Sequence, residues 1–334
     1  MKKIKLIAET AWHHDGEFSF MEHLLDTILN QSKADAVKMH VTLDFDEYMD
    51  SSHSIYNDLK SKLFSLKQWT DLIKTVKNKN KDLMLLYNDI KAIEFGSQFD
   101  PLLVEIHSVC LNDIHLLDAV KNNIDSKTKV VLGVGGSTLK EINSAIDRIN
   151  HENIVLMFGF QNFPTKYEDI NYLKMKKIKS QYPDFSFGYA DHTAWDEPNN
   201  VLITLLGAAQ GVEYIEKHVT TLYGQERTDW QSAVSIEMFN EIADKIKILD
   251  ECEGNGLLDL NEGEKTYSVY GPMKKAGILK VDVSKGDKHK LENIVFKRTG
   301  ETTDLSQVDL VNKVESKYRK DKSAGSLLYK IDLD

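Results

Sequence analysis

Pairs of ionisable residues separated by one position recur near the ends of apolar segments in this sequence. They are Lys38 with His40, Glu105 with His107, and Glu216 with His218. Because side chains alternate along a β-strand, both members of each pair would point to one face. Ionisable side chains on an inward-facing strand position are costly unless they bind a ligand. The spacing therefore predicts a polar site where these strands end.

Two histidines near the ends of consecutive apolar segments, His192 and His218, suggest metal chemistry. One histidine alone is more often a hydrogen-bonded side chain, but two imidazoles on neighbouring strands suit a divalent ion such as Mn, Fe, Co or Zn. Manganese is our first expectation, with Co, Mg, Fe or Zn as alternatives. Asp191 would orient His192, contact the substrate, or simply close the turn as a cap.

Two loops carry weaker signals. Gly133-Val134-Gly135-Gly136-Ser137-Thr138 leads from a strand into a helix, so its backbone N–H groups could cradle a phosphate. Glycines at a tight turn are required for geometry about as often, and both readings stay open. The run Phe163-Pro164-Thr165-Lys166-Tyr167 is a loop and helix start, or a wall of the substrate site.

These residues lie in a chain whose short apolar runs alternate with segments of helical period up to about residue 250. The expected strands are Lys5–Thr10, Ala36–Val41, Leu83–Tyr87, Leu102–His107, Val130–Val134, Ile154–Phe158, Ser186–Tyr189 and Glu213–His218. The expected helices include Phe18–Asn30, Leu66–Asn78, Asp113–Asn122, Thr138–Ile149, Tyr167–Ser180, Asn200–Gly211 and Ile236–Leu249. This order predicts a (β/α)8 TIM barrel over residues 1–250, with a doubly wound open sheet as the alternative.

The composition changes after the predicted barrel. Residues 251–266 are acidic and glycine-containing, which indicates a linker. Residues 267–334 contain short strand-like pieces at Ile278–Val283, Ile294–Lys297 and Ser326–Ile331, which predict a small β-rich domain.

Charge and composition limit the partners. There are 42 Lys and Arg against 52 Asp and Glu, with a net charge of -10, and the basic residues are scattered. We therefore expect no nucleic-acid partner. No window approaches the ~18 apolar residues of a membrane span, so we expect no membrane association. Only Cys110 and Cys252 occur, which fits a reducing, cytoplasmic setting.

Several segments together resemble the N-acetylneuraminate (sialic acid) synthase family, which includes legionaminic, pseudaminic and spore-coat polysaccharide synthases. They are Ile7-Ala8-Glu9 with His14-Asp15-Gly16, Ala34–Lys38, Phe163–Asp169, Phe187–Thr193 and Tyr214–Thr220 followed by Asp229. In the tail, Lys285-Gly286 and Val295–Gly300 resemble the antifreeze-like (SAF) domain of these enzymes. The resemblance covers essentially the whole chain.

The resemblance implies a metal-dependent condensation of phosphoenolpyruvate with an N-acylated aldose to give a 2-keto sugar acid and phosphate, for surface polysaccharide biosynthesis. It implies a domain-swapped homodimer whose partner subunit supplies Arg298 to the sugar. It also implies that His192 and His218 bind the metal, Glu9 and Asp229 hold the sugar, and Lys38 meets phosphoenolpyruvate. We accordingly expect catalytic roles for Glu9, Lys38, Glu105 and Asp229, and substrate contacts from His40, His107, Ser108, Gly135, Gly136, Gln161, Phe163, Asp191 and Arg298.

The departures from the family pattern concentrate at the phosphoenolpyruvate positions. The second phosphoenolpyruvate lysine is Glu105 here, which reverses the charge. Other family residues are replaced at His40, Gly133, Gln161, Phe163 and Ala190, whereas Ser108 keeps its serine. Three hypotheses follow: a synthase of altered specificity, a metal-dependent lyase, aldolase or isomerase that acts without phosphoenolpyruvate, and a non-catalytic sugar-binding relative.

Overall fold

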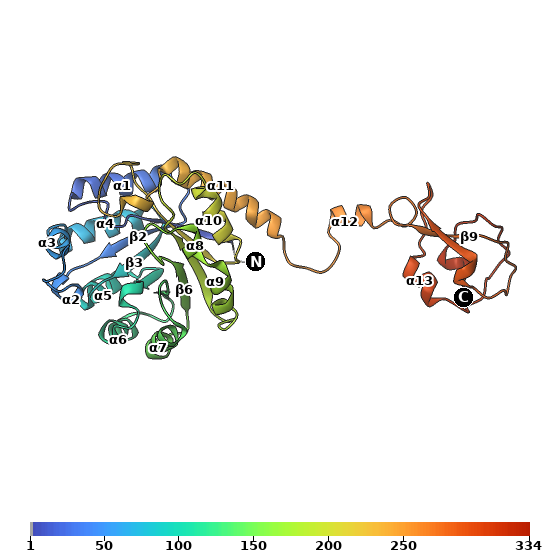
Figure 1. Cartoon of the computed structure of the whole chain (residues 1–334), viewed down its shortest axis with the longest axis horizontal. Helices are drawn as coiled ribbons and strands as arrows, with labels where there is room; N and C mark the ends of the chain where they lie inside the picture. Colours follow the sequence, from blue (N-terminus) through green and yellow to red (C-terminus); the bar gives the residue numbers. More distant parts are fainter. Residues whose placement is uncertain (1–2) are drawn as a thin grey trace. The chain divides into compact units, whose positions relative to one another are not determined.

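A computed structural model describes residues 3–334 of the chain. The chain divides into two compact units, Met1–Asn255 and Gly256–Asp334. The first unit is the closed barrel that the βα alternation predicts, and the second is much smaller (Figure 1).

The barrel consists of parallel strands in sequential order, so the alternative of an open sheet is wrong. The strands are β1 (Lys5–Glu9), β2 (Ala36–Val41), β3 (Asp82–Tyr87), β4 (Leu103–Ile106), β5 (Lys129–Gly133), β6 (Ile154–Gly159), β7 (Ser186–Asp191) and β8 (Tyr214–His218). They differ from the predicted segments only at their ends. Strand β1 pairs with β8 and closes the barrel, and this register places Glu9 opposite His218.

Helices surround the strands (Figure 1). Six agree with predicted segments: α1 (Phe18–Gln31), α4 (Leu66–Asn78), α6 (Ile114–Asn123), α7 (Leu139–Ile149), α10 (Asn200–Ala208) and α11 (Ile236–Glu253). The sequence pattern missed α2 (Phe45–Tyr48), α3 (Tyr56–Lys60) and α5 (Ile90–Gly96), which are short. Among the helices in residues 3–334, none combines the length and the apolar character needed to cross a membrane.

The single helix expected over Tyr167–Ser180 is wrong, because two helices occupy this segment. They are α8 (Tyr167–Ile170) and α9 (Tyr172–Lys179). Asn171 between them has a left-handed backbone with φ of 52°, and its side chain accepts a hydrogen bond from the backbone N–H of Lys174. Asparagine tolerates this conformation and caps helix N-termini, so it ends one helix and starts the next.

Alternation along the strands sorts the barrel side chains into two layers. Outward-facing residues such as Leu6, Val37 and Leu132 pack in the large core beneath the helices. Inward-facing residues form a smaller apolar cluster of Ile7, Ala36, Met84, Leu103, Val131, Val155, Met157, Ala190 and Tyr214. Further along the same inward face the residues become ionisable, as with Glu9 after Ile7 and Lys38 after Ala36. The apolar cluster therefore closes the barrel beneath a polar end.

The second unit contains a small antiparallel sheet, as predicted. It pairs β9 (Ala276–Leu279) antiparallel with β10 (Ile294–Lys297), and it contains α13 (Gln307–Asn312). The predicted strand Ser326–Ile331 is wrong: one bridge joins Leu327 to Ile278, and Lys330–Asp332 forms a 3-10 turn. A separate core includes Leu279, Ile294, Leu305, Leu310, Tyr318 and Leu328.

The expected linker, residues 251–266, is partly helical. Helix α11 continues to Glu253, and α12 (Glu262–Tyr267) begins at Asn261. Asn261 and Glu264 form a capping box, in which each side chain binds the other residue's backbone N–H. Reciprocal capping satisfies donors that a helix start leaves free, which explains a helix in so polar a segment.

Candidate active site

The carboxyl ends of the barrel strands surround a cavity of about 320 Å³. All six members of the alternating pairs line it: Lys38, His40, Glu105, His107, Glu216 and His218. Glu9, Ser108, Gly135, Phe163, His192 and Asp229 line it as well. The alternating pairs therefore face the barrel interior, as their spacing predicts, and polar side chains gather at the barrel end that holds the active site in enzymes of this fold.

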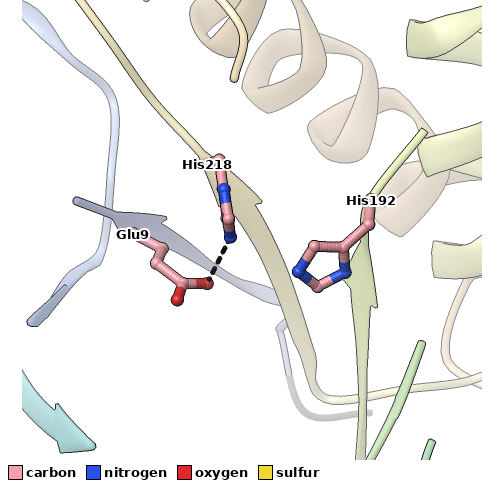
Figure 2. A group of neighbouring side chains, drawn as sticks. All are labelled: Glu9, His192 and His218. Atoms are coloured by element: carbon pink, nitrogen blue, oxygen red, sulfur yellow. Dashed lines mark ion pairs between the residues drawn. The ribbon is translucent and has the colours of Figure 1, made fainter. Parts of the chain in front are cut away.

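Three buried side chains in the cavity could hold a metal ion together. One ligand atom from each of Glu9, His192 and His218 lies within 4.8 Å of the others. Figure 2 shows the three side chains pointing toward one another, Glu9 from β1, His218 from β8 and His192 from the position just after β7. The Nε2 atom of His218 is 3.4 Å from Oε2 of Glu9. Glu9, which the resemblance assigned to the sugar, thus joins the two expected ligands.

The donor set fits a divalent transition ion. Burial lowers the pKa of His192 to about 3, so its imidazole is neutral, the form that ligates metals. The Nδ1 atom of His192 lies 3.1 Å from the carbonyl oxygen of Ala190 and donates to it. This hydrogen bond leaves the Nε2 lone pair free to ligate an ion. Two imidazoles and one carboxylate are ligands that Mn, Fe, Co and Zn accept.

Lys38 lies among three glutamates at the base of the cavity. Its Nζ is 2.8 Å from Oε2 of Glu105, 2.9 Å from Oε1 of Glu216 and 3.4 Å from Oε1 of Glu9. All four side chains are at most 4% exposed. Glu105, the charge reversal that the sequence revealed, therefore faces the site and pairs directly with Lys38.

Burial and neighbouring charges shift the pKa values of the three glutamates in this cluster in different directions. Burial raises the pKa of Glu105, and burial together with the Glu9 charge raises the pKa of Glu216 well above its usual range. Burial opposes ionisation of Glu9 too, but Lys38, His218 and His40 hold its pKa well below the usual range. The cluster favours ionised Glu9, the carboxylate that also faces His192 and His218.

Asp229 and the loop after β1 form one side of the cavity. Asp229 has a left-handed backbone with φ of 62°, and its Oδ2 accepts a hydrogen bond from the backbone N–H of Trp12 at 3.2 Å. His13 supports this contact, because its Nε2 lies 3.0 Å from the Asp229 carbonyl oxygen. These contacts hold the Asp229 carboxylate at the cavity edge, where a sugar hydroxyl could reach it.

Three expected substrate residues of the barrel unit lie outside the cavity. Asp191 faces away from the barrel interior and pairs with Lys217 at 2.7 Å, because strand alternation turns it opposite to His192. Gly136 and Gln161 line a separate, smaller cavity of about 120 Å³ between the loops after β5 and β6. Arg298 belongs to the second unit, and its role stays a prediction.

The glycine-rich turn after β5 has a packing explanation. A Cβ atom on Gly135 would lie 2.0 Å from the carbonyl oxygen of Gly159, and one on Gly133 would lie 2.7 Å from the backbone nitrogen of Ser108. Both glycines are therefore needed where neighbouring backbones meet, with or without a bound anion.

Sequence reasoning missed two parts of the cavity lining. The sequence pattern pairs Glu216 with His218 without indicating a role for Glu216, although the shared strand face already places its side chain in the cavity. An apolar wall of Trp12, Tyr48, Met49, Ile55 and Leu59 also lines the cavity. Four of these residues lie in the long connection between β2 and α4, whose position depends on packing against the loop after β1.

Comparison with known proteins gives a consistent group of relatives. The model of the NeuB family matches residues 25–257. An uncharacterized protein of Methanocaldococcus jannaschii is 24% identical, covering 98% of this chain and 94% of its own. The pseudaminic acid synthase of Campylobacter jejuni is 23% identical, and the match covers 88% of this chain and 86% of the synthase. The structure of a putative spore coat polysaccharide biosynthesis protein E from Chromobacterium violaceum matches with a TM-score of 0.80 and 16% identity. The match covers 98% of this chain and 99% of that chain.

Proposed function

Because the chain belongs to the NeuB family, we propose that it is a metal-dependent enzyme of the sialic-acid-synthase type. Its reaction would join phosphoenolpyruvate and water to an open-chain N-acylated aldose: the enol carbon forms a carbon–carbon bond to the aldehyde carbon, and phosphate leaves to give a 2-keto sugar acid. The observation that carries this proposal is the convergence of Glu9, His192 and His218 in the barrel cavity. The relationship to a pseudaminic acid synthase supports the sugar-acid chemistry.

Glu9, His192 and His218 would hold a divalent ion, with manganese first among Mn, Co, Mg, Fe and Zn. Such an ion, when bound, supplies Lewis-acid polarisation of a carbonyl oxygen. Other residues of the chain bind the sugar and exclude water. Asp229 accepts hydrogen bonds from sugar hydroxyls, and the Phe163 ring limits water around His192 and His218. Ring centroids place Phe163 5.8 Å from His192 and 6.0 Å from His218, which supports this shielding role.

We extend the proposal to the second unit and to the biological setting. The second unit is taken as an SAF domain that reaches the partner's barrel in a domain-swapped homodimer, with Arg298 contacting the sugar N-acyl group. The product would enter surface polysaccharide biosynthesis in the cytoplasm. Phosphoenolpyruvate, the donor that the resemblance implies, is part of this proposal. The pairing of Glu105 with Lys38 favours the alternative, a metal-dependent lyase, aldolase or isomerase that acts without phosphoenolpyruvate.

A substrate screen combined with metal analysis tests the proposal. The purified chain is stripped with chelator, reloaded with Mn or Co, and incubated with N-acyl hexosamines, with and without phosphoenolpyruvate. New 2-keto sugar acids are identified by mass spectrometry, and phosphate release is followed in parallel. We expect activity only in the reloaded enzyme.

Variants link the activity to the proposed ligands. His192→Ala combined with His218→Ala should lose both metal content and turnover. His23→Ala, which removes an exposed histidine on α1, is the matched control and should keep both. Full metal content and full turnover in the double variant would contradict the assignment.

A further inference from the structure

Phe160, the residue after β6, is a large aromatic side chain that lines the barrel cavity. It belongs to none of the apolar cores that the described residues form. Its ring centroid lies 5.0 Å from that of His107, 5.2 Å from that of His192 and 6.3 Å from that of Phe163. These three partners line the same cavity. The ring of Phe160 therefore packs against the site and not against the core of the barrel.

The backbone of Phe160 has a left-handed conformation, with φ of 52°. This conformation is costly for a bulky residue, because its Cβ crowds the following backbone. Neighbouring backbones hold the turn in place. A Cβ atom on Gly159 would lie 1.9 Å from the carbonyl oxygen of Ala190, and one on Gly135 would lie 2.6 Å from the carbonyl oxygen of Phe160. The turn is therefore held between β7 and the loop after β5.

The loop that begins at Phe160 lies against His192, one of the three proposed metal ligands. The backbone N–H of Thr165, later in this loop, donates to the His192 carbonyl oxygen at 2.8 Å. Within residues 3–334, the imidazole itself has one hydrogen bond, from Nδ1 to the carbonyl oxygen of Ala190. One hydrogen bond leaves the ring free to tilt about the direction of that bond. The Phe160 ring meets the imidazole edge to face, at an interplanar angle of 66°, and limits this freedom.

Strained backbone conformations persist where the surrounding structure enforces them, and they gather at functional sites. Asparagine or glycine would adopt this backbone at lower cost. We propose that Phe160 is a positioning residue whose ring holds the His192 imidazole in the orientation that metal binding requires. It thereby keeps a ring nitrogen of His192 within reach of Glu9 and His218. This inference rests on the proposed function, since it adds a supporting residue to the same metal site.

Phe160→Asn in the full-length chain tests the proposal without requiring turnover, because it removes the ring and suits the left-handed backbone. The probes are manganese and cobalt ions alone. Calorimetry should show manganese affinity reduced ~10-fold or more, in the range for lost residues that support a metal ligand. The visible absorption bands of the cobalt-loaded chain should shift, because they depend on ligand geometry. In urea, the unfolding midpoint of the metal-free chain should stay equal or rise, because the strain is relieved.

NMR of the His192 ring in the metal-free chain gives a readout that needs no metal. In the wild type we expect the Nδ1–H form, since the bond to the Ala190 carbonyl oxygen requires a donor at Nδ1. In Phe160→Asn we expect a mixture of tautomers, because a ring that tilts away from this carbonyl loses the preference.

Two controls separate positioning from packing. Phe160→Tyr keeps the ring and should retain most of the manganese affinity and the cobalt spectrum. Asp100→Asn introduces asparagine at another left-handed position, with φ of 45°, which is exposed and outside the cavity, and it should change neither.

Equal manganese affinity in the wild type and Phe160→Asn would overturn the proposal. A urea midpoint that falls in Phe160→Asn would overturn it as well, because it would assign the ring to packing. Failure of the wild-type chain to bind either metal would instead count against the proposed function. The His192 ring signal then decides the positioning role, and identical signals in the two chains would refute it.

Discussion

The Nδ1 atom of His218 lies 3.2 Å from the hydroxyl oxygen of Ser232, while Nε2 of the same ring faces Glu9. The serine thus holds the ring in the orientation that turns Nε2 toward Glu9. Ser232 is fully buried just after the loop that carries Asp229, so this orientation is built into the barrel. Outer partners of this kind orient a ligand histidine.

Removing the serine hydroxyl should weaken metal binding. We expect Ser232→Ala to lower manganese affinity by ~10- to 100-fold, the usual effect of losing an outer partner. Ser232→Thr keeps a hydroxyl group and should retain most of the manganese affinity. Metal titration by calorimetry, with thermal unfolding of the metal-free chain to check folding, measures both. Equal affinities in wild type and Ser232→Ala would show that the hydroxyl does not orient His218.

The buried pair of Asp191 and Lys217 should matter for stability. Both side chains are 0% exposed, and Thr193 and Thr204 also donate hydrogen bonds to Asp191. Lys217→Met leaves the carboxylate without its counter-ion, so we expect a loss of ~3 to 5 kcal/mol in the free energy of unfolding. The double variant Asp191→Asn with Lys217→Met should lose less. Urea unfolding of the barrel provides the measurement, and equal losses would contradict this coupling.

The second unit should become less stable in mild acid because of His289. Its Nε2 donates to the Leu310 carbonyl oxygen at 2.9 Å, and its Nδ1 accepts from the Tyr318 hydroxyl at 3.1 Å. Burial holds its pKa below the ordinary value of 6.5, so folding favours the neutral ring. The stabilisation is complete above that value and is lost as the pH falls below it.

Hydrogen exchange in α13 measures this effect. We expect the opening free energy to fall by about 1.4 kcal/mol per pH unit once the pH is between the ordinary and the folded pKa. His289→Gln should remove the slope. A wild-type slope that persists in this variant would assign the pH dependence to another group.

Separating the two units should separate folding from sugar binding. A chain that ends at Asn255 retains the whole barrel unit, and we expect it to fold and to bind manganese. If Arg298 reaches the sugar from the partner subunit, this chain and Arg298→Ala should both lose sugar affinity by ~10-fold or more, as for a lost charged contact. Dilution of the full chain should lower its activity. A fully active, monomeric barrel would rule out that role for the second unit.

The alternation of apolar and ionisable residues was sufficient to predict most of the barrel and much of its cavity. Side chains two apart on a strand share a face whatever the strand packs against, so Lys38 and His40 had to point the same way. The same rule separates Asp191 from His192, and it excludes Asp191 from the cavity. These features depend on local geometry, which the sequence carries directly.

Contacts between distant strands were decided by the tertiary structure alone. Glu9 meets His218 because closure of the barrel pairs β1 with β8, and no local pattern specifies that pairing or its register. The same closure surrounds Lys38 with Glu105 and Glu216 and thereby cancels the charge that its sequence motif suggested. Local patterns determined which residues face inward, and the closed register determined which of them meet.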